Sequence, residues 1–247
     1  MQSDAPSTRS WCNERLADPA DDLYFAVLFS PHEMRGSVRA IAALFVELEA
    51  IVTRFRELNI ARTKLAWWRD ELERLDAGSA SHPVTKMLAE DNADTSHLLL
   101  SDLVTGMELI LLAGPVTDLA TAQMRAERGL ARLTVVLARL FGDASAPVED
   151  YASLGTAIGL TRLLAASGLD QEARQSIASA AQNQLAAECP MAGTAPAPLR
   201  VLAALAWRKS TGRTARVSTQ RSDPRRVFTA WQAARGRLPR KMVRNPT

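Results

Sequence analysis

The stretch of sequence that decides the fold is SPHEMRGSVRAIAALFVELEAIVTRFRELNIARTKLAWWRDELERLD, residues 30–76. Its first half places apolar residues at steps of three and four, which line one face of an α-helix. These residues are Val38, Ile41, Phe45, Leu48, Val52 and Phe55. The pattern predicts a packed helix from residue 30 to about residue 58, and a second amphipathic helix over residues 62–77 that ends at Gly78.

The first of these helices has a recognisable start. Ser30 supplies a hydroxyl N-cap, Pro31 stands at the first helical position, and Glu33 follows three residues after the cap. Each of these residues suits the free backbone N–H groups of a first helical turn. We therefore predict that Ser30 caps this helix.

Glu49 is the unusual acid of the same helix, because it falls at the edge of the apolar face when about 100° is allowed per residue. A carboxylate turned partly into a core is costly unless another group compensates its charge. Three compensating groups remain open: Arg56 of the same helix, a residue elsewhere in the chain, or a bound cation.

The composition of the whole chain predicts an all-α protein with one large helical domain. Of its 247 residues, 47% are hydrophobic, which is ample for a buried core. Ala, Leu, Arg and Glu dominate, and apolar residues recur at helical spacing. No run of about 18 apolar residues could span a bilayer, and no signal peptide is visible, so we expect a cytoplasmic protein. Cys12 and Cys189 predict neither a metal site nor a disulfide.

We divide the chain into a disordered leader (residues 1–10), a helical domain (residues 11–238) and a basic tail (residues 239–247). Beyond the first two helices, Gly and Pro boundaries and helical spacing indicate several more. They are expected over residues 97–113, 118–140, 147–167, 171–188 and 199–208, with a Pro/Ala/Gly loop over residues 190–198.

Three polar or aromatic residues are given structural roles. Asp22 is expected to cap the helical turn after it, because a cap needs one neighbour and a metal site needs several. His82 is expected in a cap region, because no His or Cys partner stands at metal spacing. Trp68 is expected in the core, because it and Trp67 point about 100° apart on their helix.

Several segments together resemble the squalene/phytoene synthase family, which joins two prenyl diphosphates head to head on an all-helical fold. The segments are Tyr24-Phe25-Ala26, Phe29-Ser30-Pro31, Arg35, residues 43–52 (ALFVELEAIV), residues 64–72 (KLAWWRDEL) and His82-Pro83-Val84. The resemblance covers about residues 23–238 and implies an isoprenoid-synthase-like helical bundle. The variant Val46-Glu47-Leu48, with Trp67-Trp68-Arg69-Asp70 after it, looks more like a divergent branch that includes a mitochondrial complex I assembly factor than like the active synthases.

The resemblance is weakest at the family's two aspartate-rich motifs, which hold magnesium in active members. The positions of the first motif hold Glu49, Ala50 and Thr53, so two of three carboxylates are missing. The positions of the second motif and of the asparagine and arginine before it hold Arg162, Ala165, Ala166 and Asp170. Only Asp170 survives there. Arg162 replaces the neutral asparagine and brings a cation to the place where magnesium would sit.

Two functions follow from the resemblance. The first is a non-catalytic, assembly-factor-like protein that binds a partner protein or a prenyl-type lipid. The alternative is an active, Mg²⁺-dependent prenyl diphosphate transferase in which Glu49 and Asp170 are the candidate catalytic and metal-binding residues. Arg35, Arg56 and Arg162 are the candidate substrate-binding residues, because guanidinium groups match phosphate oxygens.

A ligand needs space between the helix of residues 30–58 and that of residues 147–167. The small residues Gly155 and Gly159 in the second helix either leave room for a ligand or let two helices approach closely. We predict an apolar cavity between these helices, of a few hundred Å³, with Arg56 and Arg162 near its mouth.

The last part of the sequence is strongly basic, although the net charge of the chain is only +3. A single acid, Asp223, accompanies Arg200, Arg208, Lys209, Arg213, Arg216, Arg221, Arg225, Arg226, Arg235, Arg237, Arg240, Lys241 and Arg244. This end is either a solvated basic face or a contact for an anionic membrane surface or an acidic partner. No nucleic-acid-binding motif is present, so we do not expect nucleic acid as the partner. Val227, Phe228 and Trp231 share one helical face, which either meets a membrane or docks on the protein's own core.

Overall fold

The computed structural model describes residues 7–17, 22–55, 57–91, 98–142, 148–165, 168–211, 224–239 and 242. All regular structure in these ranges is helical, which confirms the all-α prediction. The elements are α1 (Thr8–Arg15), α2 (Leu23–Leu28), the 3₁₀ turn η1 (His32–Met34), α3 (Arg35–Arg54), α4 (Leu58–Asp76), α5 (Pro83–Glu90), α6 (Ser101–Ala113), α7 (Leu119–Arg128), α8 (Leu130–Leu140), α9 (Val148–Leu163), α10 (Gln171–Ala187), α11 (Cys189–Thr194), α12 (Ala197–Thr211) and α13 (Pro224–Ala234).

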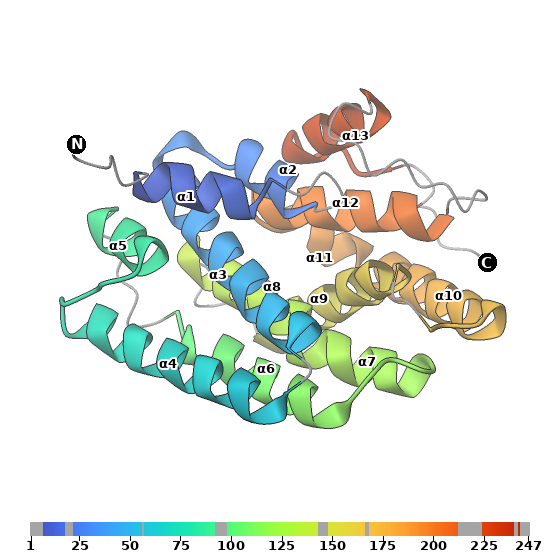
Figure 1. The fold of residues 1–247 in the computed structure, drawn as a ribbon. Helices are drawn as coiled ribbons and strands as arrows, with labels where there is room; N and C mark the ends of the chain where they lie inside the picture. Colours follow the sequence, from blue (N-terminus) through green and yellow to red (C-terminus); the bar gives the residue numbers. More distant parts are fainter. Residues whose placement is uncertain are drawn as a thin grey trace.

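Helix α3 is the centre of the fold. It runs through the middle of Figure 1, with α4 and α6 on one side and α12 and α13 on the other. Its predicted apolar residues Val38, Ile41, Phe45 and Leu48 are each at most 1% exposed and belong to the main core cluster. The spacing of three and four residues therefore predicted the buried face of α3 correctly.

Two smaller apolar clusters complete the core. One joins α7, α9 and α10 through residues that include Ala122, Leu160 and Ile177. The other joins α2, α12 and α13 and includes Phe25 and Ala230. None of the helices in the described ranges is long and apolar enough to cross a membrane.

The predicted helix start at Ser30 is wrong. The Ser30 hydroxyl donates a hydrogen bond back to the carbonyl oxygen of Ala26 at 2.7 Å, so it serves the end of α2 and not the start of α3. Because Ser30 follows α2 so closely, the carbonyls of that helix are the nearest free acceptors. The chain then passes through η1 before α3 begins at Arg35.

The junction between the first two long helices also lies earlier than predicted. Helix α3 ends at Arg54, and Phe55 has extended backbone and a side chain that is 36% exposed. Helix α4 begins at Leu58, not at residue 62. The apolar spacing continued across this turn, so periodicity by itself did not reveal it.

Two further predictions along the chain are wrong. The pattern over residues 118–140 forms two helices, α7 and α8, because the backbone bends sharply at Gly129 (φ −103°, ψ −93°). The expected loop over residues 190–198 contains α11. Pro190 is compatible with that helix because it lies in the first turn, where no backbone N–H donor is needed.

The structure describes a part of each predicted end of the domain. Helix α1 begins at Thr8, so part of the expected leader is helical, and residues 1–6 lie outside the described residues. In the expected tail, Met242 is 1% exposed and belongs to the main core cluster. The other residues of the tail beyond Pro239 lie outside the described ranges.

Candidate functional site

The open question about Glu49 is resolved by a residue on a distant helix. Arg162 of α9 faces Glu49 of α3 with two parallel contacts: its Nε donates to Oε1 at 3.1 Å and its Nη2 to Oε2 at 2.6 Å. The Arg162 side chain is 24% exposed and the Glu49 side chain is 28% exposed. This bidentate geometry is the strongest form of an arginine–carboxylate pair. Arg56, the other arginine considered, lies outside the described residues.

A second guanidinium stands close to this pair. Arg125 of α7 lines the same hollow and donates a hydrogen bond from Nη1 to the carbonyl oxygen of Gly114 at 3.2 Å. Burial lowers the pKa of Arg125, and the charge of Glu49 acts in the opposite direction. The sequence reasoning missed Arg125, although its position beside the buried Ala122 and Ala126 placed it at the edge of an apolar face.

These three charged groups line a small cavity. Its volume is about 20 Å³, and its wall consists of Phe45, Glu49, Val52, Met107, Ile110, Arg125, Ala126, Gly129, Leu130, Gly159, Arg162 and Leu163. The place and the mostly apolar lining agree with the prediction, but the size does not. A space of this volume suits a few water molecules at most, whereas ligand pockets usually exceed about 300 Å³.

Close helix packing explains why the cavity is small. A Cβ atom at Gly155 would lie 2.1 Å from Oγ1 of Thr134 and 2.5 Å from Cα of Ala131, both in α8. A Cβ atom at Gly159 would lie 2.8 Å from Cβ of Ala126 in α7. Of the two readings left open for these glycines, close approach of helices is therefore the one that the structure supports.

Two other predicted site residues, Arg35 and Asp170, do not join Glu49 at this cavity. Arg35 donates a hydrogen bond from Nη2 to the carbonyl oxygen of Ser30 at 3.0 Å and is not part of the cavity wall. Asp170 is exposed and caps α10, where it accepts a hydrogen bond from the backbone N–H of Ala173 at 2.7 Å. The carboxylate of Asp170 is thus used by its own helix.

Magnesium does not fit the donor set that the described residues offer around Glu49. Both oxygens of Glu49 accept from Arg162, and the adjacent motif positions hold Ala50 and Thr53, whose hydroxyl donates to the Glu49 carbonyl at 2.8 Å. Mg²⁺ prefers several hard oxygen ligands and charge neutralisation by carboxylates. Within the ranges that the structure describes, no group of three His, Cys, Asp or Glu side chains is placed to hold a metal.

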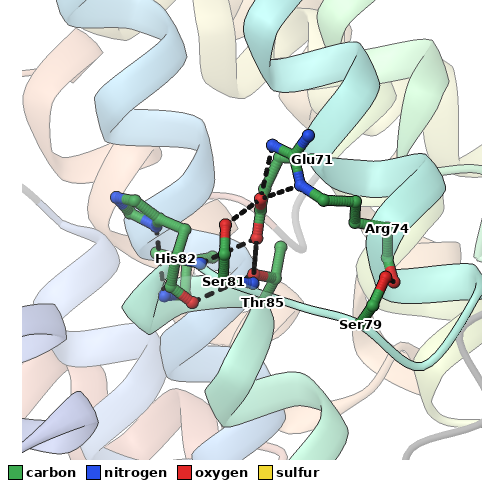
Figure 2. Close-up of polar contacts among 7 residues, drawn as sticks. Glu71, Arg74, Ser79, Ser81, His82 and Thr85 are labelled. Atoms are coloured by element: carbon green, nitrogen blue, oxygen red, sulfur yellow. Dashed lines mark hydrogen bonds and ion pairs between the residues drawn. The ribbon is translucent and has the colours of Figure 1, made fainter.

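A second acid, Glu71 of α4, is fully buried and was not singled out in the sequence (Figure 2). It accepts hydrogen bonds from the backbone N–H of Ser81 and of His82, at 2.8 and 2.7 Å. The hydroxyls of Ser81 and Thr85 donate to it at 2.6 and 2.5 Å, and Arg74 donates at 2.8 Å. Burial raises the pKa of Glu71, but the hydrogen bonds from Ser81, Thr85 and His82 outweigh it and hold the pKa well below its usual range.

This arrangement makes Glu71 a structural clamp. Buried acids with shifted pKa values are candidates for catalysis, but a catalytic group must have an accessible oxygen. The Glu71 side chain is 0% exposed and all its contacts hold the turn between α4 and the start of α5. Two arginines of α4 pair with acids at 2.8 Å: Arg74 with Glu71, and Arg69 with Glu108 of α6.

His82 sits beside this clamp, as the cap that the sequence predicted. Its Nδ1 accepts a hydrogen bond from the backbone N–H of Val84 at 3.2 Å. Its ring packs edge-on against Trp11 and Trp68, with centroids 4.6 Å away in each case. Burial lowers the pKa of His82 to about 4, with Arg15 acting in the same direction and Glu71 against it. Trp68 is 4% exposed, which confirms its predicted place in the core.

The capping role predicted for Asp22 is wrong. Its side chain makes no cap hydrogen bond, and it pairs instead with Lys209 at 2.5 Å and with Arg226 at 2.6 Å. Two cations from α12 and α13 outcompete the nearby backbone N–H groups, because a charge-assisted pair is stronger than a neutral donor.

The two cysteines are free and buried. Burial raises the pKa of the Cys12 thiol to about 11, against the lowering effect of Arg39, and burial also raises the pKa of Cys189. Both thiols therefore stay protonated at neutral pH, where a protonated thiol is a poor nucleophile.

Comparison with known proteins identifies the family. A family model described as squalene/phytoene synthase matches residues 16–236, which include α3 with Glu49 and α9 with Arg162. The searches of curated proteins and of solved structures found no match. The all-α domain is the fold that the family implies, and the family also implies binding of prenyl diphosphates. With a match over most of its length, this chain belongs to the squalene/phytoene synthase family.

Proposed function

We propose that this chain is a non-catalytic member of the family that works as a binding protein, in the manner of the assembly-factor branch. The observation that carries the proposal is the bidentate ion pair between Glu49 and Arg162. It ties up the surviving carboxylate of the first motif with a cation that the chain itself supplies. A side-chain guanidinium then stands in for the charge that a metal ion would bring.

The charge balance supports this proposal. Glu49 carries one negative charge, whereas Arg125 and Arg162 carry two positive charges on the same cavity wall. A further divalent cation beside them would be repelled: two unit charges about 4 Å apart interact by about 4 kcal/mol at an effective dielectric constant of 20. Loss of the motif carboxylates at Ala50 and Thr53 removes the attraction that would offset this repulsion.

The size of the cavity favours a partner protein over a prenyl chain as the bound molecule. The cavity that the described residues line between α3 and α9 has a volume of about 20 Å³, which is too small for an isoprenoid tail. A partner protein needs only the outer surface of the helical domain. We therefore assign the binding role to the surface, and the interior to packing.

The alternative function is an active prenyl diphosphate transferase, and the excess positive charge favours it. Arg125 and Arg162 both reach the cavity wall, and guanidinium groups bind diphosphate oxygens well. In that case the helices around the cavity must separate to admit a substrate. The two functions make opposite predictions for turnover.

The test is release of diphosphate from farnesyl or geranylgeranyl diphosphate by the purified chain, with and without Mg²⁺. We expect no release above the rate without protein. A Glu49→Gln variant serves as the matched control, because it keeps the shape of the side chain and removes the charge. Mg²⁺-dependent turnover that disappears in this variant would refute the non-catalytic proposal and support the transferase.

A second measurement tests whether the ion pair between Glu49 and Arg162 takes the place of a metal ion. An Arg162→Asn variant restores the neutral residue of the family motif and frees the Glu49 carboxylate. Titration calorimetry with Mg²⁺ should show no binding for the natural chain. If the natural chain binds Mg²⁺ as tightly as the Arg162→Asn variant, the ion pair does not replace the metal.

A further inference from the structure

The outer face of α13 is an exposed aromatic surface in a basic part of the chain. Phe228 is 55% exposed and Trp231 is 37% exposed, with their rings stacked at a centroid distance of 5.9 Å. Val227, on the same face, is 38% exposed. Figure 1 shows α13 on the outside of the bundle, lying against α12. The side chains of Phe228 and Trp231 are therefore not the ones that dock α13 on the core.

The opposite face of α13 is firmly attached to the domain. Ala230 and Ala233 are 0% exposed and pack in the cluster with α2 and α12. Arg226 is 3% exposed and pairs with Asp22, while Arg200 of α12 donates from Nε and Nη2 to the carbonyl oxygens of Ala233 and Ala234, both at 2.9 Å. These contacts fix the direction in which the aromatic face points.

The charge around the aromatic face has one sign. Residues 224–239 contain four arginines and no acid, and the only buried one of these, Arg226, is already paired. Arg225, Arg235 and Arg237 are exposed, and Arg235 lies over the ring of Trp231 at 4.3 Å. The sequence on either side of this segment adds six further cations against a single acid, Asp223.

We propose that the outer face of α13 docks on an anionic membrane surface. Phe228 and Trp231 enter the headgroup region, where an amphipathic aromatic ring is favoured, and the exposed arginines contact lipid phosphates. A membrane fits this surface better than a protein does. The positive charge is uniform and spread over a long part of the sequence, which suits a diffuse negative surface and offers no pattern for a particular acidic partner.

This inference does not depend on whether the cavity at Glu49 is catalytic. Docking uses residues on the face of α13 that points away from α12, and none of these residues lines the cavity. If the chain turned out to release diphosphate, the membrane proposal would therefore still stand. If the chain did not bind vesicles, the non-catalytic proposal would still stand.

The experiment measures co-sedimentation of the full chain with vesicles of phosphatidylcholine alone and of phosphatidylcholine with one third phosphatidylglycerol. We expect binding to the anionic vesicles only, with a loss at raised salt as the charges are screened. Arg235→Gln should weaken binding about fivefold, the usual contribution of one arginine near such a surface. Phe228→Ala should weaken it by at least a similar factor.

Two matched controls test whether α13 is the docking surface. Leu112→Ala alters a side chain that is 60% exposed on α6, and Arg62→Gln removes one exposed charge from α4. Neither should change binding by more than about twofold, because a rim charge or an isolated apolar group far from the contact adds little. Thermal melts should show that all four variants fold like the natural chain.

A direct readout comes from tryptophan fluorescence with vesicles whose lipids carry bromine near the start of the acyl chains, which quench indole rings that reach the boundary between headgroups and acyl chains. Quenching should occur with the natural chain and should fall sharply in Trp231→Phe, while sedimentation of that variant is largely kept. Equal binding to neutral and anionic vesicles, unchanged binding in Phe228→Ala, or quenching that survives in Trp231→Phe would each overturn the proposal. Binding to an acidic protein with no binding to vesicles at low salt would do the same.

Discussion

Removal of the Glu71 carboxylate should destabilise the whole domain. In Glu71→Ala, the buried hydroxyl of Thr85 loses its 2.5 Å acceptor, and the backbone N–H groups of Ser81 and His82 lose theirs. Each buried donor that loses its acceptor costs about 1–3 kcal/mol, so we expect a total loss of at least about 3 kcal/mol. The contact with Arg74 adds little to this cost, because the Arg74 side chain is 37% exposed and screened by water.

The expected loss is large enough to measure in a simple melt. In a chain of this size, each kcal/mol corresponds to about 2–4 °C in Tm, so Glu71→Ala should melt at least about 6 °C below the natural chain. Urea denaturation followed by circular dichroism gives the free energy of unfolding itself. Thr85→Val, which keeps the shape and removes one donor, should cost about 1 kcal/mol.

Glu71→Gln separates the charge of the residue from its shape. Glutamine keeps one acceptor oxygen but points an N–H₂ group at a set of donors, so we expect a loss of about 2–4 kcal/mol. Glu73→Gln is the matched control, because Glu73 is exposed on the same helix and should change stability by less than about 0.5 kcal/mol. If Glu71→Gln and Glu73→Gln unfold at the same urea concentration, the clamp does not contribute as argued.

The pH dependence of the same variants gives an independent check. The pKa of Glu71 is lowered in the folded chain, so its stabilising effect is full above the unfolded value of about 4.3. It is lost as the pH falls below that value towards the folded pKa. The stability difference between the natural chain and Glu71→Gln should therefore shrink below about pH 4. A difference that is constant down to pH 2 would show that the ionised form is not what matters.

Two further predictions concern His82 and Gly155. The pKa of His82 is lowered to about 4, so the folded chain resists protonation of this side chain. The free energy of unfolding should therefore fall by up to about 3 kcal/mol as the pH drops from 6.5 to 4. Urea denaturation at several pH values should show this decrease, and a His82→Gln variant should not show it. Gly155→Ala should lower the free energy of unfolding by about 1–3 kcal/mol, because its Cβ would lie 2.1 Å from a hydroxyl oxygen of α8. Gly193→Ala is the control in a melting experiment, since no atom lies within 4 Å of its Cβ position, and equal Tm values for both alanine variants would contradict the close-packing argument.

The sequence by itself determined the features that depend on a few neighbouring residues. The all-α class and the buried face of α3 follow from helical spacing. The cap role of His82 follows from the lack of a His or Cys partner at metal spacing. The need for a partner at Glu49 was also visible, since an acid at the edge of an apolar face must be compensated. Prediction from neighbouring residues was wrong where one side chain had two possible hydrogen-bond partners. Ser30 is the example, because its hydroxyl bonds to the preceding helix and not to the following one.

Only the tertiary structure decided which groups meet across helices. Glu49 could have paired with several groups, and the packing of α9 against its neighbours brought Arg162, 113 residues away, into contact with it. The clamp at Glu71 and the double pair at Asp22 have the same origin, as does the outward direction of the aromatic face of α13. Periodicity fixes the face on which a side chain lies. The partner of that side chain depends on how whole helices stack, and stacking depends on shape details such as Gly155, where one added methyl group would no longer fit.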